Sequence, residues 1–182
     1  VPFLLDAINT LETEHWKRFA LELFAKYTPK QFFTLPASMS KKKHHETELS
    51  VGEFSPTEPE KLVKMGGKYY HSYRVYLKLL EILEPDTPEV LDYKGEKTVK
   101  YVYGNEYEAW ERDVMKVAAL SHDIFSGGKE DETNPKRKYM DKNHAHYHKT
   151  ELLPLAKLVP QNEWDTYIMI VDNHMWKCAT CC

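Results

Sequence analysis

The sequence predicts a mainly α-helical single domain with a small β-hairpin insertion near residues 88–104. Three observations support this fold class. Apolar residues recur with the period of a helix in several separate segments of the chain. A stretch with two prolines and two β-prone pieces interrupts this helical pattern. The length of 182 residues suits one domain with a sizeable core.

The first third of the chain is predicted to form one helix and one long loop. Residues 10–27 alternate apolar and charged residues with the helical period, and Asn9 or Thr10 is expected to cap the helix. Residues 28–59 contain four prolines and a cluster of Lys and His, which indicates an extended loop.

The middle of the chain combines a long helix with the predicted hairpin. A short helix over 60–65 is expected to end before a Gly-Gly pair. The stretch 69–83 is apolar on most sides, which predicts a buried central helix. Two β-prone pieces then flank a Lys-Gly-Glu turn centred on Gly95, and this pattern predicts the hairpin.

The last third of the chain is predicted to be helical again. Residues 107–121 carry one apolar face, and residues 125–142 are polar and initially glycine-rich, so a mobile loop is expected there. Residues 152–159 predict a helix that Pro154 kinks, and residues 161–177 predict the last helix.

Composition narrows the class of protein. Apolar residues make up 42% of the chain and charged residues 29%, as in ordinary globular proteins. No apolar run approaches about 20 residues, so no membrane span is expected, and the apolar start lacks the basic flank of a signal peptide. The formal net charge of −3 disfavours nonspecific binding to nucleic acid. Cys178, Cys181 and Cys182 form no disulfide framework, so a reducing cytoplasm is the expected compartment.

A His-Asp doublet, His122-Asp123, ends the predicted helix 107–121. His122 falls close to the apolar face of that helix, where a histidine bonded to a backbone carbonyl is the ordinary alternative. Burying the Asp123 carboxylate without a partner is expensive. A divalent cation shared by the two side chains removes that cost, so the doublet predicts two metal ligands.

Further histidines lie far from the doublet in sequence. His71 stands near the start of the apolar helix 69–83, with Arg74 one turn later, where it could meet a phosphate. If residues 143–148 are helical, His148 shares a face with His144 and points inward, while His146 points away. The alternative for this cluster is a solvated loop or an adventitious metal binder.

The last predicted helix adds Asp172 and His174. They are two residues apart, roughly 200° around a helix axis. One of them is therefore expected to be a direct ligand, and the sequence does not choose between them.

These residues stand in segments that resemble the HD-domain superfamily of metal-dependent phosphohydrolases. The resemblance implies a helical bundle that brings a first His, the His-Asp doublet and later His or Asp residues onto one or two divalent cations (Mn, Mg, Fe, Co or Zn). One subgroup shows an opening of the form PAS…HH…GG…HS and a later HMGxW segment. The matching segments here are 32–38, 43–45 with Gly66-Gly67, 71–75, 118–124 and 173–176.

The chain departs from this family pattern at two places. Relatives often carry Gly and Lys soon after the doublet, whereas this chain has Phe125-Ser126 followed by two glycines. A phosphate-side Lys is then missing unless Lys129 or the 41–43 loop substitutes. Relatives of the HMGxW type also place a last metal-binding Asp further downstream. Either the sequence is truncated, or Asp172 takes that role here, or the site is incomplete.

The resemblance implies a division of the chain and a role for each residue. Residues 1–28 would form an N-terminal helix, 29–59 a substrate-side loop and 60–177 the metal-binding core. The cation would polarise a phosphoryl oxygen and activate a water. The expected metal ligands are His71, His122, Asp123, His148, Asp172 and His174. The expected catalytic residues are Asp123, Arg74 and His148. Either His148 or His146 would protonate the leaving group. The expected substrate-binding residues are Lys43, His44, His45, Arg74, Lys129 and His146.

The resulting hypothesis is a phosphohydrolase that acts on a phosphate ester, with a small nucleotide as the expected substrate and self-association left open. Two alternatives stay open. One is a degenerate HD-type module that binds a ligand without turnover. The other is a 3′-5′ exonuclease-like phosphodiesterase, because the PAS…HH opening also occurs in relatives that act on 3′ ends.

Overall fold

The structure is a computed structural model that describes residues 2–34, 67–84, 89–91, 94–99, 102–128 and 143–174. Most of this part of the chain is helical, as the sequence predicts. In chain order the elements are α1 (Pro2–Asn9), α2 (Glu14–Glu22), the π-helix η1 (Leu23–Tyr27), α3 (Lys30–Thr34), α5 (Gly67–Leu83), β1 (Glu89–Leu91), β2 (Lys97–Val99), the 3-10 helix η3 (Tyr103–Glu106), α6 (Ala109–Ser121), α7 (His144–Glu151), the 3-10 helix η4 (Leu153–Leu158) and α8 (Gln161–Asn173).

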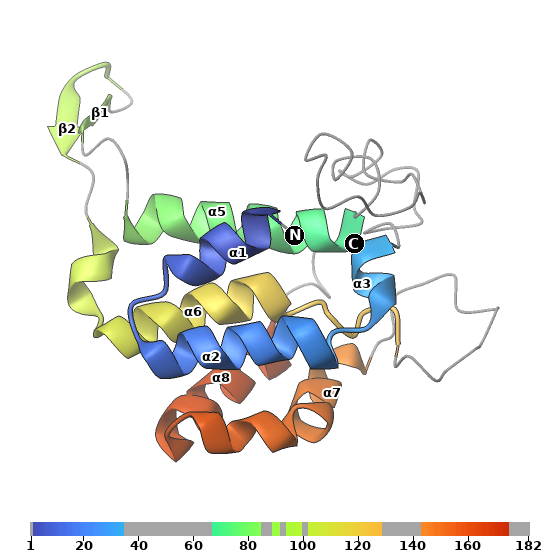
Figure 1. Ribbon diagram of the computed structural model, residues 1–182. Coiled ribbons are helices and arrows are strands. Elements are labelled where there is room, and N and C mark those ends of the chain that lie inside the picture. The colour runs from blue at the N-terminus through green and yellow to red at the C-terminus, as the bar shows by residue number, and fades with distance from the viewer. Residues whose placement is uncertain are drawn as a thin grey trace.

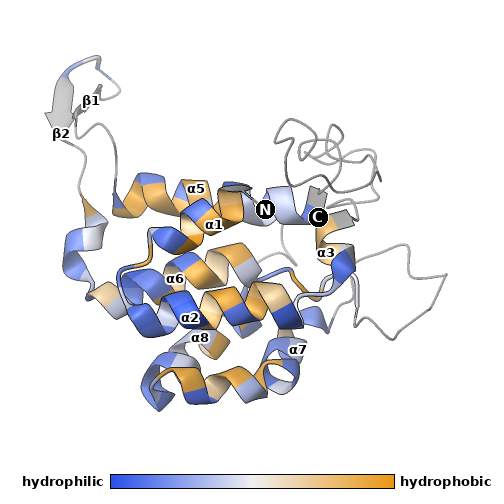
Figure 2. Ribbon diagram, viewed as in Figure 1, coloured by the Kyte–Doolittle hydropathy of each residue, from blue (hydrophilic) through white to orange (hydrophobic). Residues whose placement is uncertain are grey.

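Helix α6 is the centre of the bundle. Figure 1 shows α6 between α5 and α8, with α2 alongside, and α6 contacts all three. Its apolar face, which includes Val114, Val117 and Leu120, is fully buried. The outer helices are more mixed, and Figure 2 shows hydrophobic and hydrophilic residues alternating along α2. This amphipathic pattern lets α2 cover the core with one face and meet solvent with the other.

An aromatic cluster joins α2 to α8. Trp16 and Phe19 of α2 pack against Tyr167 of α8, and all three side chains are fully buried. The Glu163 carboxylate accepts a hydrogen bond of 2.7 Å from Trp16 Nε1 and lies 2.8 Å from His15 Nε2. These polar contacts satisfy a buried carboxylate at the helix contact, where it would otherwise destabilise the fold.

The prediction of one helix over residues 10–27 is wrong at its start. The chain is already helical in α1, turns after Asn9, and begins α2 at Glu14. The buried carboxylate of Asp113 explains the turn, because it accepts hydrogen bonds from the backbone N–H of Glu12 at 2.9 Å and of Thr13 at 2.8 Å. A side chain of α6 therefore satisfies donors that a continuous helix would have satisfied itself.

Two further expectations for the middle of the chain need correction. Helix α5 agrees with the predicted helix 69–83, but it is not buried on all sides, since Leu77 is 40% exposed and Ile82 50% exposed. One of its faces packs on α6, and the other faces outward. Residues 30–34, predicted as loop, form α3, whose Phe32 is buried against Tyr69 of α5.

The connections around α6 and α7 also differ from the predicted helix pattern. Residues 153–158 form a 3-10 helix with Pro154 in its first turn, in place of a kinked α-helix over 152–159.

The strands β1 and β2 pair antiparallel, with Val90 opposite Thr98. Gly104 of η3 lies against the end of α5, where a Cβ would come within 2.4 Å of the Leu83 carbonyl oxygen.

Several sequence expectations fall outside the described residues. They include the short helix over 60–65, most of the loops 28–59 and 125–142, and the C-terminal cysteines. In the part of the chain that the structure describes, no helix has the length and apolar character needed to cross a membrane.

Candidate metal centre

The C-terminal end of α6 positions the candidate site. The Ser121 hydroxyl donates a hydrogen bond of 2.7 Å to the Val117 carbonyl and accepts one of 2.9 Å from the Tyr167 hydroxyl of α8. Both hydroxyl-bearing side chains are fully buried. These contacts fix the helix end against α8, and the next two residues, His122 and Asp123, enter the space between the helices.

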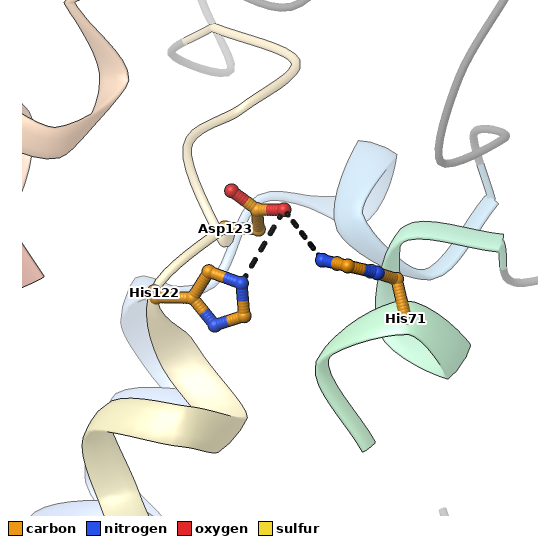
Figure 3. Close-up of side chains that lie close together, drawn as sticks. All are labelled: His71, His122 and Asp123. Atoms are coloured by element: carbon orange, nitrogen blue, oxygen red, sulfur yellow. Dashed lines mark ion pairs between the residues drawn. The ribbon is translucent and has the colours of Figure 1, made fainter. Parts of the chain in front are cut away.

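One oxygen of the Asp123 carboxylate faces His71 and His122. Figure 3 shows the three side chains, with His71 coming from α5 and the doublet from the end of α6. Asp123 Oδ2 lies 3.7 Å from His71 Nε2 and 3.6 Å from His122 Nε2. The three ligand atoms lie within 4.8 Å of one another, which places them within reach of a single cation.

The other oxygen of Asp123 faces His144 and His174. Asp123 Oδ1 lies 3.1 Å from His144 Nε2 and 3.5 Å from His174 Nε2. The two ring nitrogens lie 3.0 Å apart, so they point at the same small volume. His144 begins α7 and is fully buried, and His174 directly follows α8. These three residues form a second group with metal-ligand spacing.

The Asp123 carboxylate therefore stands between two pairs of imidazoles. A carboxylate in this position can bridge two cations, which in two-metal sites lie roughly 3.5–4 Å apart. Imidazole nitrogens and carboxylate oxygens are ordinary ligands of divalent transition metals. The four histidines and Asp123, called here the His-Asp cluster, thus fit one or two such ions.

Hydrogen bonds behind the cluster orient two of its imidazoles. His122 Nδ1 lies 2.9 Å from the Ala119 carbonyl, and His174 Nδ1 contacts the Val171 carbonyl. A proton on Nδ1 is donated to these carbonyls, so Nε2, which lies toward Asp123, is the nitrogen at which a cation would replace a proton. Histidines that bind metals usually have this arrangement, because the outer hydrogen bond fixes both the tautomer and the ring.

The electrostatics of the cluster favour an ionised carboxylate. Burial opposes ionisation of Asp123, but the charge of His122 and the hydrogen bonds of His144 and His174 outweigh it and hold its pKa well below the usual range. Burial lowers the pKa of His122, against the opposing effect of Asp123. A negative carboxylate among imidazoles, one of which resists protonation, is a suitable environment for a cation.

A cavity of about 450 Å³ opens beside the His-Asp cluster. This volume lies in the range of roughly 300–1,000 Å³ that small-molecule sites occupy. His71, His122, Asp123 and His174 line one part of it. The remaining wall is apolar and comes from α5, α6 and α8, through Val75, Leu79, Met115, Ala118, Ala119 and Ile170. The cavity therefore presents polar ligand atoms next to an apolar surface.

His148, predicted as a metal ligand and proton donor, is directed elsewhere. It is buried as predicted, but its Nε2 lies 2.9 Å from the Ser121 carbonyl and its Nδ1 3.2 Å from the Ala145 carbonyl. Burial lowers the pKa of His148 to about 4. The structure thus assigns this residue the ordinary role of a core histidine bonded to backbone carbonyls.

Asp172 and His174 have different surroundings. His174 joins the cluster, whereas Asp172 pairs with His146 Nδ1 at 2.5 Å. The His146 side chain is 69% exposed, as its predicted outward direction requires, and this ion pair lies outside the cluster. Asp172 and His146 do not line the cavity, whereas His174 does.

Of the remaining predicted site residues, the structure describes Arg74. Arg74 is exposed, and its guanidinium lies 5.9 Å from the centre of the Tyr70 ring, a cation–π contact on the same helix. The predicted substrate-binding residues Lys43, His44, His45 and Lys129 lie outside the described residues.

Sequence reasoning did not single out His144 as a candidate ligand. His144 and His148 share the buried face of α7, as predicted, but they reach different partners. His148 and Leu152 lie on a stripe that belongs to the core, whereas His144, one turn earlier in α7, approaches Asp123. The four-residue spacing of His144 and His148 predicted that they share a face. It did not show which of the two lies near the doublet.

No family model, curated protein or solved structure matches this chain.

Proposed function

We propose that this protein is a divalent-metal-dependent phosphohydrolase of the HD type that acts on a phosphate ester, with a nucleotide as the substrate class. The observation that carries the proposal is the position of Asp123, whose two oxygens face separate pairs of histidines. The ordered HD-like segments of the sequence support the same assignment.

The donor set bears on the choice of metal. Four imidazoles and one carboxylate form a nitrogen-rich site, and Mg²⁺ strongly prefers oxygen ligands. Imidazole suits Fe and Zn, whereas carboxylate, carbonyl and water ligands suit Mg and Mn. Fe and Zn are therefore favoured over Mg and Mn for this site.

The residues of the cluster and of the cavity wall would have different roles in the reaction. Bound divalent cations supply polarisation of a phosphoryl oxygen and a lower pKa for water. Asp123 holds the centre of the site, and the backbone carbonyls behind His122 and His174 keep their Nε2 atoms aimed at it. The apolar cavity wall suits the base and sugar carbon atoms of a nucleotide and limits the entry of water.

Metal stoichiometry and turnover test this proposal together. The protein is prepared without a His tag and loaded with Mn²⁺, Co²⁺ or Zn²⁺, and bound metal is quantified. Phosphate release is then screened with nucleoside mono-, di- and triphosphates. We expect metal binding and turnover in the wild type. Asp123→Ala should lose both, and His174→Ala should lower metal affinity by more than about tenfold.

The control variant is His15→Gln, which removes an imidazole outside the cluster and keeps a hydrogen-bond donor for Glu163. It should retain metal and turnover. Turnover that survives Asp123→Ala would contradict the mechanism. Bound metal without turnover on any nucleotide would instead support the alternative of a ligand-binding module.

A further inference from the structure

A lysine is buried one helical turn before His71. Lys68 lies in the first turn of α5 and is only 6% exposed. Its ammonium donates a hydrogen bond of 2.8 Å to the hydroxyl of Ser126, three residues beyond Asp123 in the loop that follows α6. Ser126 is itself buried. The contact joins the start of α5 to the segment directly after the His-Asp doublet.

The surroundings of Lys68 do not compensate its charge. Among the described residues, no carboxylate lies within the 4.0 Å of an ion pair with Lys68 Nζ, and the Ser126 hydroxyl is neutral. Burying an ammonium with a neutral partner is costly. Burial accordingly lowers the pKa of Lys68, and the negative charge of Asp123 opposes this effect. The opposing effect places Lys68 in the electrostatic field of the cluster.

Metal binding would weaken the attraction between the Asp123 carboxylate and the Lys68 ammonium. The Asp123 charge that favours the Lys68 ammonium is the same charge that divalent cations would neutralise. One or two cations together with a buried ammonium then leave the site with excess positive charge. An anion that contacts both the cations and Lys68 would neutralise it.

We propose that the Lys68 ammonium, held by Ser126, binds a phosphoryl oxygen of the ligand at the His-Asp cluster. This inference rests on the proposed function and adds a substrate-binding residue to it. Ser126 stands in the segment that directly follows the doublet. Lys68 brings an ammonium to this segment from α5.

The test uses inorganic phosphate as the probe and calorimetry as the readout. Phosphate affinity is measured for the wild type, Lys68→Met and the double variant Lys68→Met/Ser126→Lys, each in its metal-free and its Mn²⁺-loaded state. We expect Lys68→Met to weaken phosphate binding by at least about tenfold. The double variant places an ammonium at position 126 in place of the one at position 68. It should recover much of the lost phosphate affinity.

Thermal unfolding separates a binding role from a structural one. A lysine kept for ligand binding destabilises the empty protein, so Lys68→Met should raise Tm by about 2–4 °C. A structural role of the Lys68–Ser126 contact would lower Tm instead. Metal content should stay unchanged in both variants, because Lys68 is not a ligand.

The outcomes distinguish this inference from the proposed function. Equal phosphate affinity of wild type and Lys68→Met in both states, or no measurable phosphate binding by the wild type in either state, overturns the role of Lys68. A lower Tm in Lys68→Met with unchanged phosphate affinity assigns the residue to the fold. Lys68-dependent phosphate binding without metal or turnover supports the anion site and contradicts the proposed hydrolase.

Discussion

The buried histidines of the bundle fall into two kinds according to what their Nε2 atoms contact. His122 and His174 bond to carbonyls of their own helices through Nδ1 and direct Nε2 to Asp123. His148 directs Nε2 to the Ser121 carbonyl. The same residue type therefore serves as a candidate ligand in one place and as a core hydrogen-bond donor in another. Spacing along a helix does not separate these two roles.

The buried His148 leads to a prediction about pH. Its pKa of about 4 in the folded protein lies below the ordinary value of 6.5, so the unfolded chain binds a proton over this interval and the folded protein does not. Stability is then complete above about pH 6.5 and falls as the pH decreases toward 4. We expect this residue to account for about 2 kcal/mol of lost stability between pH 7 and pH 5.

Urea unfolding at several pH values checks this expectation. His148→Gln can keep a donor near the Ser121 carbonyl but has no group that titrates, so its stability should fall less steeply between pH 7 and pH 5. Other buried histidines contribute to both slopes, and the difference between the slopes isolates His148. Equal slopes in the two proteins would show that His148 does not contribute.

At the scale of single elements, the boundaries of α2 are set by a distant side chain. Local patterning over residues 10–27 is compatible with one continuous helix, yet the chain turns before Glu14. The Asp113 carboxylate, which is fully buried, accepts the backbone hydrogen bonds of Glu12 and Thr13 and the 2.6 Å hydrogen bond of the Thr13 hydroxyl. It thus holds the turn that precedes a helix 100 residues away in sequence.

Replacing Asp113 should destabilise the protein strongly. Asp113→Ala leaves the part-buried backbone donors of Glu12 and Thr13 without this acceptor, and we expect a loss of about 3 kcal/mol in the free energy of unfolding. The matched change Thr13→Val removes only the hydroxyl hydrogen bond and should cost about 1 kcal/mol. Urea unfolding measures both, and similar losses in the two variants would contradict the role of Asp113 in holding the turn.

On the scale of the whole molecule, the His-Asp cluster is where four helices meet. His71 comes from α5, the doublet from the end of α6, His144 from α7 and His174 from the end of α8. A cation bound by these residues would connect segments that are otherwise held together by apolar packing. Since such a site exists only in the folded chain, metal binding adds to the stability of the fold.

Metal should therefore raise the thermal stability of the protein. At a free metal concentration one hundred times Kd, the added stability is about 2.7 kcal/mol, which corresponds to a rise in Tm of about 5–10 °C. Chelation should reverse the shift. Asp123→Ala should abolish it, and His15→Gln should retain it. A similar shift in Asp123→Ala would show that the metal binds at other sites.

Much of the architecture and of the cluster could be predicted from the sequence. Helical periodicity predicted α5 and α6 to within about two residues, because each helix buries a face that repeats with its own period. The residue types of His71, His122 and Asp123 indicated a metal centre, since few other settings favour an aspartate on a buried face. These inferences need only local information.

What only the tertiary structure decided was which residues meet. It placed His144 beside Asp123 and turned His148 to the Ser121 carbonyl, and it paired Asp172 with His146 while His174 joined the cluster. It also brought Lys68 to Ser126 and Asp113 to the start of α2. The physical reason is that a helix fixes the direction of a side chain relative to its own axis, whereas the packing of the whole bundle fixes the rotation and height of each axis.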